Sequence, residues 1–373
     1  MTKSDRLMSF LPIDHEHMAR ALRLAERGVC TTDPNPNVGC VIVAADGTVV
    51  GEGWHERAGQ GHGEVLALAH AGDRAAGSTV YVTLEPCSHH GRTPPCADAL
   101  IAAGVARVVC AMEDPNPQVA GQGKAALEQS GIRVQSGLMA AAARELNRGF
   151  VARMERGRPW LRVKLAVSAD GRTAMASGES KWITGEAARA DVHRLRARSS
   201  AILTGIGTVL ADDPQLNARC AEPISIEQPL RVVADSSLRL NRDAKIIGAD
   251  GKARVYFCSA NDDRQAVLEA EGVKLVKTPE SEGRVCLKSL LEDLAAADVN
   301  DVLVEAGPGL NGSLLEAGLV DEIVVYQSAR IMGAAARGMF DLAAVATMDE
   351  SIQLQLCGQR FVGDDLRLTY RMA

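Results

Sequence analysis

The chain has 373 residues, enough for two domains of ordinary size, and a hydrophobic content of 46% allows each domain a full core. A formal net charge of −6 and an aromatic content of 3% count against a nucleic-acid-binding surface, which would need a basic stripe and aromatic stacking platforms. No run of about eighteen apolar residues occurs, and the first residues show no signal-peptide pattern, so we expect a soluble cytoplasmic protein with neither a membrane nor a nucleic-acid partner. Its nine cysteines are then expected to be reduced.

The first 155 residues alternate between patterns typical of helices and of strands. Apolar residues at helical spacing predict a helix over 14–28, and apolar runs at 38–43 and 48–53, joined at Asp46-Gly47, predict a hairpin. Further helices are expected at 64–71, 96–104, 124–131 and 139–150, and further strands at 80–84, 105–111 and 132–134. Strands that alternate with helices imply a layered α/β domain.

Three residues in this part fit a catalytic zinc site, namely His62, Cys87 and Cys96. Zinc binds imidazole nitrogen and thiolate sulphur in a tetrahedron, and a catalytic site offers three protein ligands and leaves the fourth position to water. Cys87 follows the expected strand 80–84, at the strand end where α/β sheets place their chemistry. Cys96 opens a helix, whose positive end favours a thiolate. Glu64 stands two residues after His62, so we expect it to contact the metal-bound water and not the metal.

The order His-x-Glu, Pro-Cys and a second Cys is typical of nucleobase deaminases, in which zinc activates water and the Glu moves protons. In this chain eight residues separate Cys87 from Cys96, where the deaminase pattern has two. The insert at 88–95 is polar and rich in hydrogen-bond donors, and we interpret it as a loop that binds an anionic substrate. The alternative is a closed structural zinc site, or ordinary buried cysteines.

The segment Glu155-Arg156-Gly157-Arg158-Pro159 interrupts the helical pattern with charge, Gly and Pro, and is the expected linker between two domains. Beyond it, strands are expected at 160–167, 201–204, 230–234, 254–259, 274–276, 302–305, 323–328, 352–356 and 366–370, with helices at 186–198, 264–270 and 287–297. The second half is therefore expected to be another α/β domain with a β-rich end.

Two glycine-containing segments of the second half follow expected strands and are candidates for holding phosphate. The segment 205–210 has Leu210 at the third glycine position of the dinucleotide-binding fingerprint, so it is a weak signal. The segment 305–313 leaves a strand and enters a helix expected at 314–317, where free backbone N–H groups attract phosphate. A plain strand-to-helix turn is the alternative for it.

With its insert Ser88-His89-His90-Gly91-Arg92-Thr93-Pro94-Pro95, the first half resembles the deaminase part of the RibD family of bifunctional riboflavin-biosynthesis enzymes. The segments 164–172, 178–184 and 208–214 resemble the reductase part of the same family, and the likeness runs in family order from about Asp14 to the end. It implies a cytidine-deaminase-like α/β/α domain at 12–155, followed by a dihydrofolate-reductase-like α/β domain at 156–373. It also implies one Zn²⁺ per chain, NADPH as the reductant, and a homo-oligomer, with a dimer favoured.

The resemblance assigns roles to individual residues, with Glu64 as the catalytic residue. On the deaminase side it implies substrate contacts for Asn35, His55, His89 and Arg92. Along NADPH it implies Ala166, Trp182, Thr208, Asp212, Ser236, Gly307, Pro308, Gly309, Leu310, Asn311, Gly312 and Ser313. Along the reductase substrate it implies Lys164, Ser180, Arg196, Leu216, Arg219 and Glu305. Other interpretations are a surface position for His55, a core position for Trp182 and a solvated helix face for Arg196.

The implied reactions are the hydrolytic deamination of 2,5-diamino-6-(5-phosphoribosylamino)pyrimidin-4(3H)-one to 5-amino-6-(5-phosphoribosylamino)uracil, and then NADPH-dependent reduction of the ribosyl to the ribityl side chain. Two other classes of function compete with this hypothesis. One is an RNA-editing deaminase with a carboxyl-terminal binding module, against which the acidic charge and scarce aromatics count. The other is a redox sensor that binds zinc and nucleotide without turnover, against which the presence of Glu64 counts.

Overall fold

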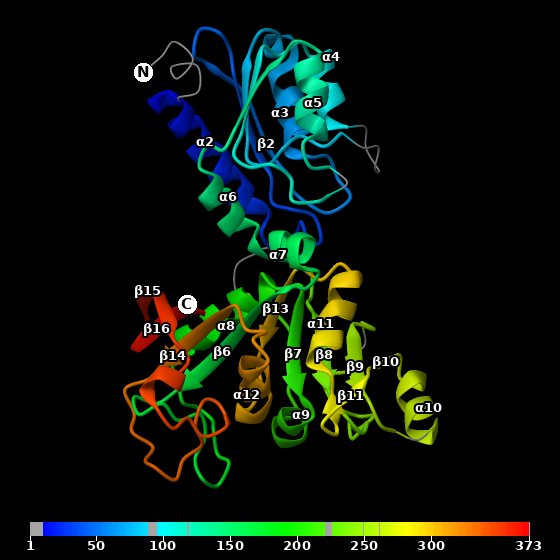
Figure 1. Ribbon diagram of the computed structural model, residues 1–373, viewed down its shortest axis with the longest axis vertical. Coiled ribbons are helices and arrows are strands. Elements are labelled where there is room, and N and C mark those ends of the chain that lie inside the picture. Colours follow the sequence, from blue (N-terminus) through cyan, green and yellow to red (C-terminus); the bar gives the residue numbers. More distant parts are fainter. Residues whose placement is uncertain are drawn as a thin grey trace. The chain divides into compact units, whose positions relative to one another are not determined.

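The computed structural model describes residues 10–88, 95–117, 119–220, 226–248, 250–260 and 262–372. The chain divides into two compact units, Met1–Gly157 and Arg158–Ala373 (Figure 1). Both units are built from sheets and helices, which confirms the expected α/β class. Within the described ranges, no helix has the length and apolar character needed to cross a membrane.

A five-stranded sheet with the order β2-β1-β3-β4-β5 forms the middle layer of the first unit. Its strands are β1 (Gly39–Val43), β2 (Val49–Trp54), β3 (Thr79–Val82), β4 (Arg107–Cys110) and β5 (Arg133–Ser136). β1 runs antiparallel to β2 and β3, whereas β3, β4 and β5 are parallel and are connected through α4 (Cys96–Ala102) and α5 (Gln122–Gln129). These two helices lie on one face together with α3 (Gly63–Ala71), and α2 (Pro12–Ala25) and α6 (Ala140–Leu146) lie on the other (Figure 1).

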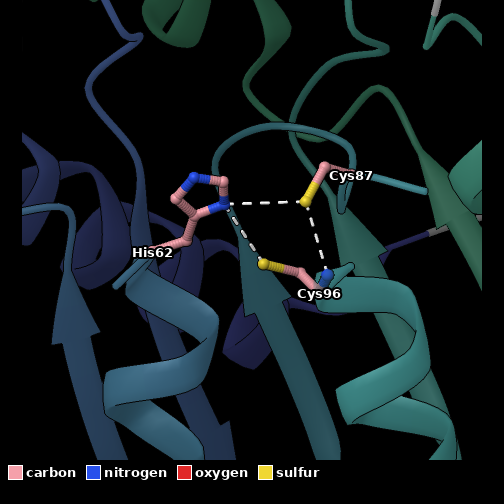
Figure 2. Close-up of side chains that lie close together, drawn as sticks. All are labelled: His62, Cys87 and Cys96. Carbon is pink, nitrogen blue, oxygen red and sulfur yellow. Dashed lines mark hydrogen bonds between the residues drawn. The ribbon is translucent and has the colours of Figure 1, made fainter. Parts of the chain in front are cut away.

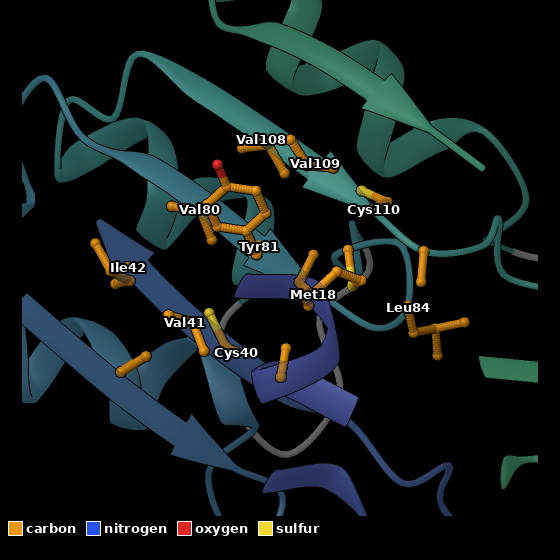
Figure 3. Close-up of a cluster of buried hydrophobic side chains, with 14 of the residues drawn as sticks. Met18, Cys40, Val41, Ile42, Val80, Tyr81, Leu84, Val108, Val109 and Cys110 are labelled. Atoms are coloured by element: carbon orange, nitrogen blue, oxygen red, sulfur yellow. The ribbon is translucent and has the colours of Figure 1, made fainter. Parts of the chain in front are cut away.

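The core of the first unit fills both faces of this sheet. Val80, Val82 and Val108 are fully buried, and so is Met18 of α2. Tyr81, which alternates with Val80 and Val82 along β3, points to the face that α2 covers, where its hydroxyl group donates to Asp14. Figure 3 shows Met18, Val80 and Val108 among the buried side chains gathered around β1, β3 and β4. Strands that are buried on both faces have nearly continuous apolar sequences, and this is why β3 and β4 could be predicted from short β-branched runs.

Glycine allows α3 to lie directly on the hairpin strand β2. A Cβ atom on Gly51 would lie 2.2 Å from the carbonyl oxygen of Ala67, and one on Gly53 would lie 2.4 Å from the carbonyl oxygen of Gly63. Both distances are far below van der Waals contact, so larger residues would push the helix away. The close packing therefore fixes the first turn of α3, where His62 and Glu64 are located.

A nine-stranded sheet with the order β10-β9-β8-β7-β13-β6-β14-β16-β15 organises the second unit. Its strands are β6 (Trp160–Val167), β7 (Ala201–Gly205), β8 (Leu230–Ala234), β9 (Ala253–Phe257), β10 (Lys274–Lys277), β13 (Asp301–Val304), β14 (Glu322–Gln327), β15 (Leu354–Val362) and β16 (Asp365–Met372). The seven strands from β10 to β14 are parallel, and β16 and β15 form an antiparallel hairpin at the edge. Two buried apolar clusters form the core of the unit.

Five α-helices, the short 3-10 helix η3 (Met348–Glu350) and one small ribbon complete the described part of the second unit. The helices are α8 (Glu186–Ala197), α9 (Ile206–Asp212), α10 (Asp262–Ala270), α11 (Leu287–Ala296) and α12 (Pro308–Glu316). The ribbon pairs β11 (Glu280–Ser281) with β12 (Arg284–Val285). In the first unit, the helix predicted at 139–150 is instead two helices, α6 and α7 (Arg148–Arg156), which meet at Asn147.

The two glycine-containing segments differ from the expectation in their local structure. The segment 205–210, considered as a candidate for holding phosphate, is the end of β7 and the start of the helix α9, and α12 begins at Pro308 and not at 314. Proline is well suited to the first position of a helix, because its missing N–H would have no partner there. Gly312 lies in the interior of α12, where glycine is needed: a Cβ atom at this position would lie 1.9 Å from the carbonyl oxygen of Asp341.

The contact between α3 and β2 leads to a first prediction. Gly51→Ala places a methyl group against the α3 backbone, and overpacking of this kind typically costs about 1–3 kcal/mol. Scanning calorimetry should therefore show a lower unfolding temperature for the first unit. Gly61→Ala is the matched control, because the heavy atom nearest to the added Cβ would be Cδ2 of Leu66, at 3.9 Å. Equal unfolding temperatures for the two variants would contradict the close-packing account.

Candidate active sites

His62, Cys87 and Cys96 bring their metal-binding atoms together in the first unit (Figure 2). Nδ1 of His62 lies 3.6 Å from Sγ of Cys87 and 3.3 Å from Sγ of Cys96. A tetrahedral site with a Zn–N bond of about 2.0 Å and a Zn–S bond of about 2.3 Å has N···S edges of about 3.5 Å. The three side chains therefore fit a zinc ion, and Nδ1 is the nitrogen of His62 that faces it.

Two helix starts and one strand end position these three side chains. His62 is the N-cap of α3, Cys96 is the first residue of α4, and Cys87 follows β3. The backbone N–H of Cys96 donates a hydrogen bond of 3.3 Å to Sγ of Cys87. Hydrogen bonds from Cys96 and His62 outweigh the opposing effect of burial and lower the pKa of the Cys87 thiol. A thiolate, the form that binds metal, is thus favoured at Cys87.

Glu64 is a buried carboxyl group beside this cluster, with 3% of its surface exposed. Its Oε2 atom has no hydrogen-bond partner among the described residues. Burial raises the pKa of the Glu64 carboxyl to about 7. A carboxyl group that has a pKa near neutrality and one oxygen without a hydrogen-bond partner can both accept a proton and return it. Glu64 does not belong to the metal-binding cluster found in the described part of the chain.

His55 lies next to the metal-binding cluster and forms a hydrogen bond with Asn35. His55 is 2% exposed, so its interpretation as a surface residue is wrong. Its Nδ1 atom lies 3.1 Å from the carbonyl oxygen of Gly61, which can only accept, so Nδ1 carries the proton. Its Nε2 atom then accepts a 3.1 Å hydrogen bond from Nδ2 of Asn35. Burial lowers the pKa of His55, which favours this neutral form, and the ring centroid lies 5.3 Å from that of His62.

The expected substrate contacts of His89 and Arg92 lie outside the described residues. The same holds for most of the insert between Cys87 and Cys96, of which only Ser88 and Pro95 are described. Its interpretation as an anion-binding loop stays a prediction.

A cleft of about 890 Å³ in the second unit brings together most of the residues expected to bind NADPH and the reductase substrate. The lining includes Lys164, Ala166, Ser180, Trp182, Arg196, Thr208, Asp212, Leu216, Arg219, Glu305, Gly307, Pro308, Gly309 and Leu310. The cleft lies where β6, β7 and β13 end and where α9 and α12 begin, which is the usual place for a ligand in an open α/β sheet.

The lining does not include four of the expected cofactor residues, namely Ser236, Asn311, Gly312 and Ser313. Oγ of Ser236 accepts a 3.2 Å hydrogen bond from the backbone N–H of Val285. Asn311 is fully buried, and its Nδ2 atom donates to the carbonyl oxygen of Ala306 at 3.1 Å. Because α12 begins at Pro308, Asn311 and Gly312 lie on the buried side of the helix, and only its first turn lines the cleft.

Glu305 is held at the cleft by two cations. Arg196 donates to it through Nε at 2.5 Å and through Nη2 at 3.0 Å, and Nζ of Lys164 lies 3.5 Å from Oε2. Burial acts to raise the pKa of Glu305, but Arg196 and Lys164 together lower it to about 2. Glu305 is therefore ionised at neutral pH and cannot donate a proton there. The Arg196 side chain is only 14% exposed, so its interpretation as a solvated helix residue is wrong.

The starts of α9 and α12 leave room for a phosphate-containing ligand beside the backbone. Cβ atoms added to Gly207, Gly307 or Gly309 would have no described atom within 4 Å. The free N–H groups at a helix start attract anions, so this part of the cleft fits the phosphates of a dinucleotide. Trp182 is 62% exposed and lines the cleft, so its core interpretation is wrong.

Four ionisable residues of this cleft are not among the residues predicted from the sequence, namely Lys181, Arg189, His193 and Arg337. Nζ of Lys181 lies 3.4 Å from Oδ1 of Asp212, and Nδ1 of His193 accepts a 3.2 Å hydrogen bond from the backbone N–H of Arg219. His193 is the only histidine after His90, and this isolation was the one available signal. Lys181 lies in the segment 178–184 that carries the resemblance, whereas nothing local in the sequence singles out Arg189 or Arg337.

Comparison with known proteins shows two family matches, one in each unit. Residues 12–112 match the cytidine and deoxycytidylate deaminase zinc-binding region, and residues 159–368 match the RibD C-terminal domain. Riboflavin biosynthesis protein RibD of Escherichia coli (strain K12) is 50% identical over 365 residues, which cover 95% of this chain and 98% of that protein.

Solved structures resemble the chain over nearly its full length. Acinetobacter baumannii RibD, form 1, has a TM-score of 0.91 at 45% identity and covers 97% of this chain and 99% of its own. The diaminohydroxyphosphoribosylaminopyrimidine deaminase/5-amino-6-(5-phosphoribosylamino)uracil reductase of Thermotoga maritima has a TM-score of 0.82 at 30% identity, with the same coverage.

The geometry of the metal-binding cluster leads to a second prediction. Cys96→Ser replaces a thiolate ligand with a hydroxyl group, which is a poor ligand for zinc. Metal analysis of the purified wild-type protein should give about one zinc per chain, and the variant should lose most of it. Cys357→Ser is the control, because Cys357 is exposed and lies in the other unit. Full zinc content in Cys96→Ser would exclude Cys96 as a ligand.

Proposed function

Because the chain belongs to the RibD family of bifunctional deaminases and reductases of riboflavin biosynthesis, we propose that it performs two successive reactions on one pyrimidine. The first is the zinc-dependent deamination of 2,5-diamino-6-(5-phosphoribosylamino)pyrimidin-4(3H)-one, and the second is the NADPH-dependent reduction of the ribosyl side chain of the product to ribityl. The observation that supports the first reaction best is the convergence of His62, Cys87 and Cys96 beside the buried Glu64.

In the deaminase site, His62, Cys87 and Cys96 would hold the zinc ion. Zinc supplies the Lewis acidity that makes water nucleophilic at neutral pH. Glu64 would take the proton from that water and pass it to the departing amino group, because its free Oε2 and its raised pKa suit both steps. Asn35 would hydrogen-bond the pyrimidine, with His55 holding its amide in a fixed orientation. His89 and Arg92 complete the proposed substrate contacts, and Arg92 suits the phosphate.

In the reductase site, NADPH supplies the hydride that reduces the opened sugar. The first turns of α9 and α12 would hold its phosphates, with Ala166, Trp182, Thr208 and Asp212 along the rest of the cofactor. Lys164 and Glu305 would hold the sugar hydroxyls, while Arg196 keeps Glu305 ionised and in place. Ser180, Leu216 and Arg219 would complete the substrate contacts. The chain's own contribution is thus orientation and electrostatics.

The proposal assigns deamination to residues 12–155 and reduction to residues 156–373. It also includes a homo-oligomer, with a dimer favoured, in the cytoplasm. The lining of the two sites supports the division, because each site draws its described residues from one compact unit.

A third prediction tests the role of Glu64. Glu64→Gln keeps the shape of the side chain and removes the group that takes up the proton. We expect the variant to retain zinc and to lose deaminase activity by at least roughly 100-fold, the usual contribution of a general acid-base group. Ammonia release and zinc content are measured on the same preparation. Parallel loss of zinc and activity would instead identify Glu64 as a ligand.

A fourth prediction tests the independence of the two sites. His62→Ala should abolish ammonia release and leave NADPH oxidation unchanged when the deaminated intermediate is supplied. Gly307→Val should do the reverse, because its side chain fills the open space at the start of α12. Cys357→Ser serves again as the control for both assays. If folded His62→Ala also failed to reduce the supplied intermediate, the assignment of one reaction to each unit would be wrong.

A further inference from the structure

Glu85 is a buried carboxylate that the proposed reactions do not use. It stands two residues before Cys87 and is 4% exposed. Its Oε2 atom accepts hydrogen bonds from the backbone N–H groups of Asp114 at 3.2 Å and Gly121 at 3.0 Å. Its Oε1 atom accepts a third from Lys124 at 3.1 Å. One side chain thus accepts three hydrogen bonds from backbone N–H groups between Asp114 and the first turn of α5.

The backbone after Glu85 also packs directly on α5. A Cβ atom on Gly123 would lie 1.9 Å from the carbonyl oxygen of Pro86 and 3.3 Å from Oε1 of Glu85. Gly121 is the N-cap residue of α5, so the carboxylate binds the positive end of this helix. The hydrogen bonds and the close packing therefore hold the chain just before Cys87 against α5.

Cys87 itself is held by the start of α4. Its carbonyl oxygen accepts a 3.1 Å hydrogen bond from Ala97, and its Sγ atom accepts one from Cys96. Cys87 is thus fixed from one side by α4 and, through Glu85 and Pro86, from the other side by α5. A shift of the Pro86 backbone away from α5 would move Sγ relative to Nδ1 of His62.

We propose that Glu85 is a positioning residue for the zinc site, which acts through the Pro86-Cys87 backbone. By binding the start of α5, it sets the place of Cys87 Sγ before any metal arrives and so raises the affinity for zinc. This inference rests on the proposed function only in taking Cys87 as a zinc ligand. A residue that merely stabilises the fold would lower the unfolding temperature and leave zinc affinity and ligand geometry unchanged in the folded protein.

The test uses Glu85→Gln in the full-length protein. The glutamine side chain has the same shape, but its NH₂ group is a donor and cannot accept the backbone N–H hydrogen bonds that the replaced oxygen accepted. The two sets of donors repel each other, so we expect the start of α5 to move away. Residues that orient metal ligands typically contribute 10- to 100-fold to affinity, and we expect a loss of about that size for zinc, measured by competition with a chromogenic chelator. The visible spectrum of the Co²⁺-substituted protein should change as well, because it reports the placement of the thiolates.

Tyr81→Phe is the matched control, since it removes a buried 2.7 Å hydrogen bond to Asp14 from the strand that precedes Glu85. It should lower stability and leave zinc affinity and the Co²⁺ spectrum unchanged. Gly123→Ala provides a second variant, because it presses on Pro86 while Glu85 is intact, and it should weaken zinc binding by about tenfold or more. If Glu85→Gln does not fold, the zinc affinity of Gly123→Ala tests whether the place of the Pro86-Cys87 backbone on α5 controls zinc binding.

Wild-type zinc affinity and an unchanged Co²⁺ spectrum in folded Glu85→Gln, or in Gly123→Ala if Glu85→Gln is unfolded, would overturn the inference. The same measurements on Cys87→Ser separate this failure from that of the proposed function. If Cys87→Ser loses zinc while Glu85→Gln binds it normally, only the positioning role is wrong. If Cys87→Ser keeps zinc at wild-type affinity, the proposed ligand set is wrong, and the role of Glu85 is overturned with it.

Discussion

Free backbone N–H groups at helix starts, gathered where parallel strands end, are the constraint on which both candidate sites depend. In the first unit, the starts of α3 and α4 carry His62 and Cys96, and the N–H of Cys96 reaches the sulphur of Cys87. In the second unit, the starts of α9 and α12 open onto the cleft beside Glu305. Because four N–H groups at each helix start lack partners within the helix, these edges favour thiolates, carboxylates and phosphates.

The two buried glutamates show how the same residue type serves different chemistry. Burial is the main cause that raises the pKa of Glu64 to about 7, whereas Arg196 and Lys164 overcome burial and lower that of Glu305 to about 2. Glu64 is therefore suited to proton transfer, and Glu305 to holding a substrate by its fixed charge. A zinc ion near Glu64 would add positive charge and lower its pKa, so metal binding and proton transfer are coupled in that site.

Much of this arrangement was predictable because the decisive signals are local. The β-branched run that forms β3, the apolar run that forms β6 and the spacing of His62, Glu64, Cys87 and Cys96 are short sequence patterns, and they indicate the fold class and the candidate zinc site. The start of α12 and the helix α9 were not predicted, because their glycines suggested loops. In α12 the missing Cβ of Gly312 allows close packing against the backbone of Asp341, a contact that the local sequence does not reveal. The burial of His55, the Arg196–Glu305 pair and the contacts of Glu85 join residues far apart in the sequence, which no local pattern encodes.

The most direct test of the account is a crystal structure of the protein with bound NADPH, recorded at the X-ray absorption edge of zinc. We expect an anomalous peak between Nδ1 of His62 and the sulphur atoms of Cys87 and Cys96, and NADPH phosphates beside the first turns of α9 and α12. A zinc peak that excludes any of these three ligands, or a cofactor bound outside the cleft of the second unit, would contradict it.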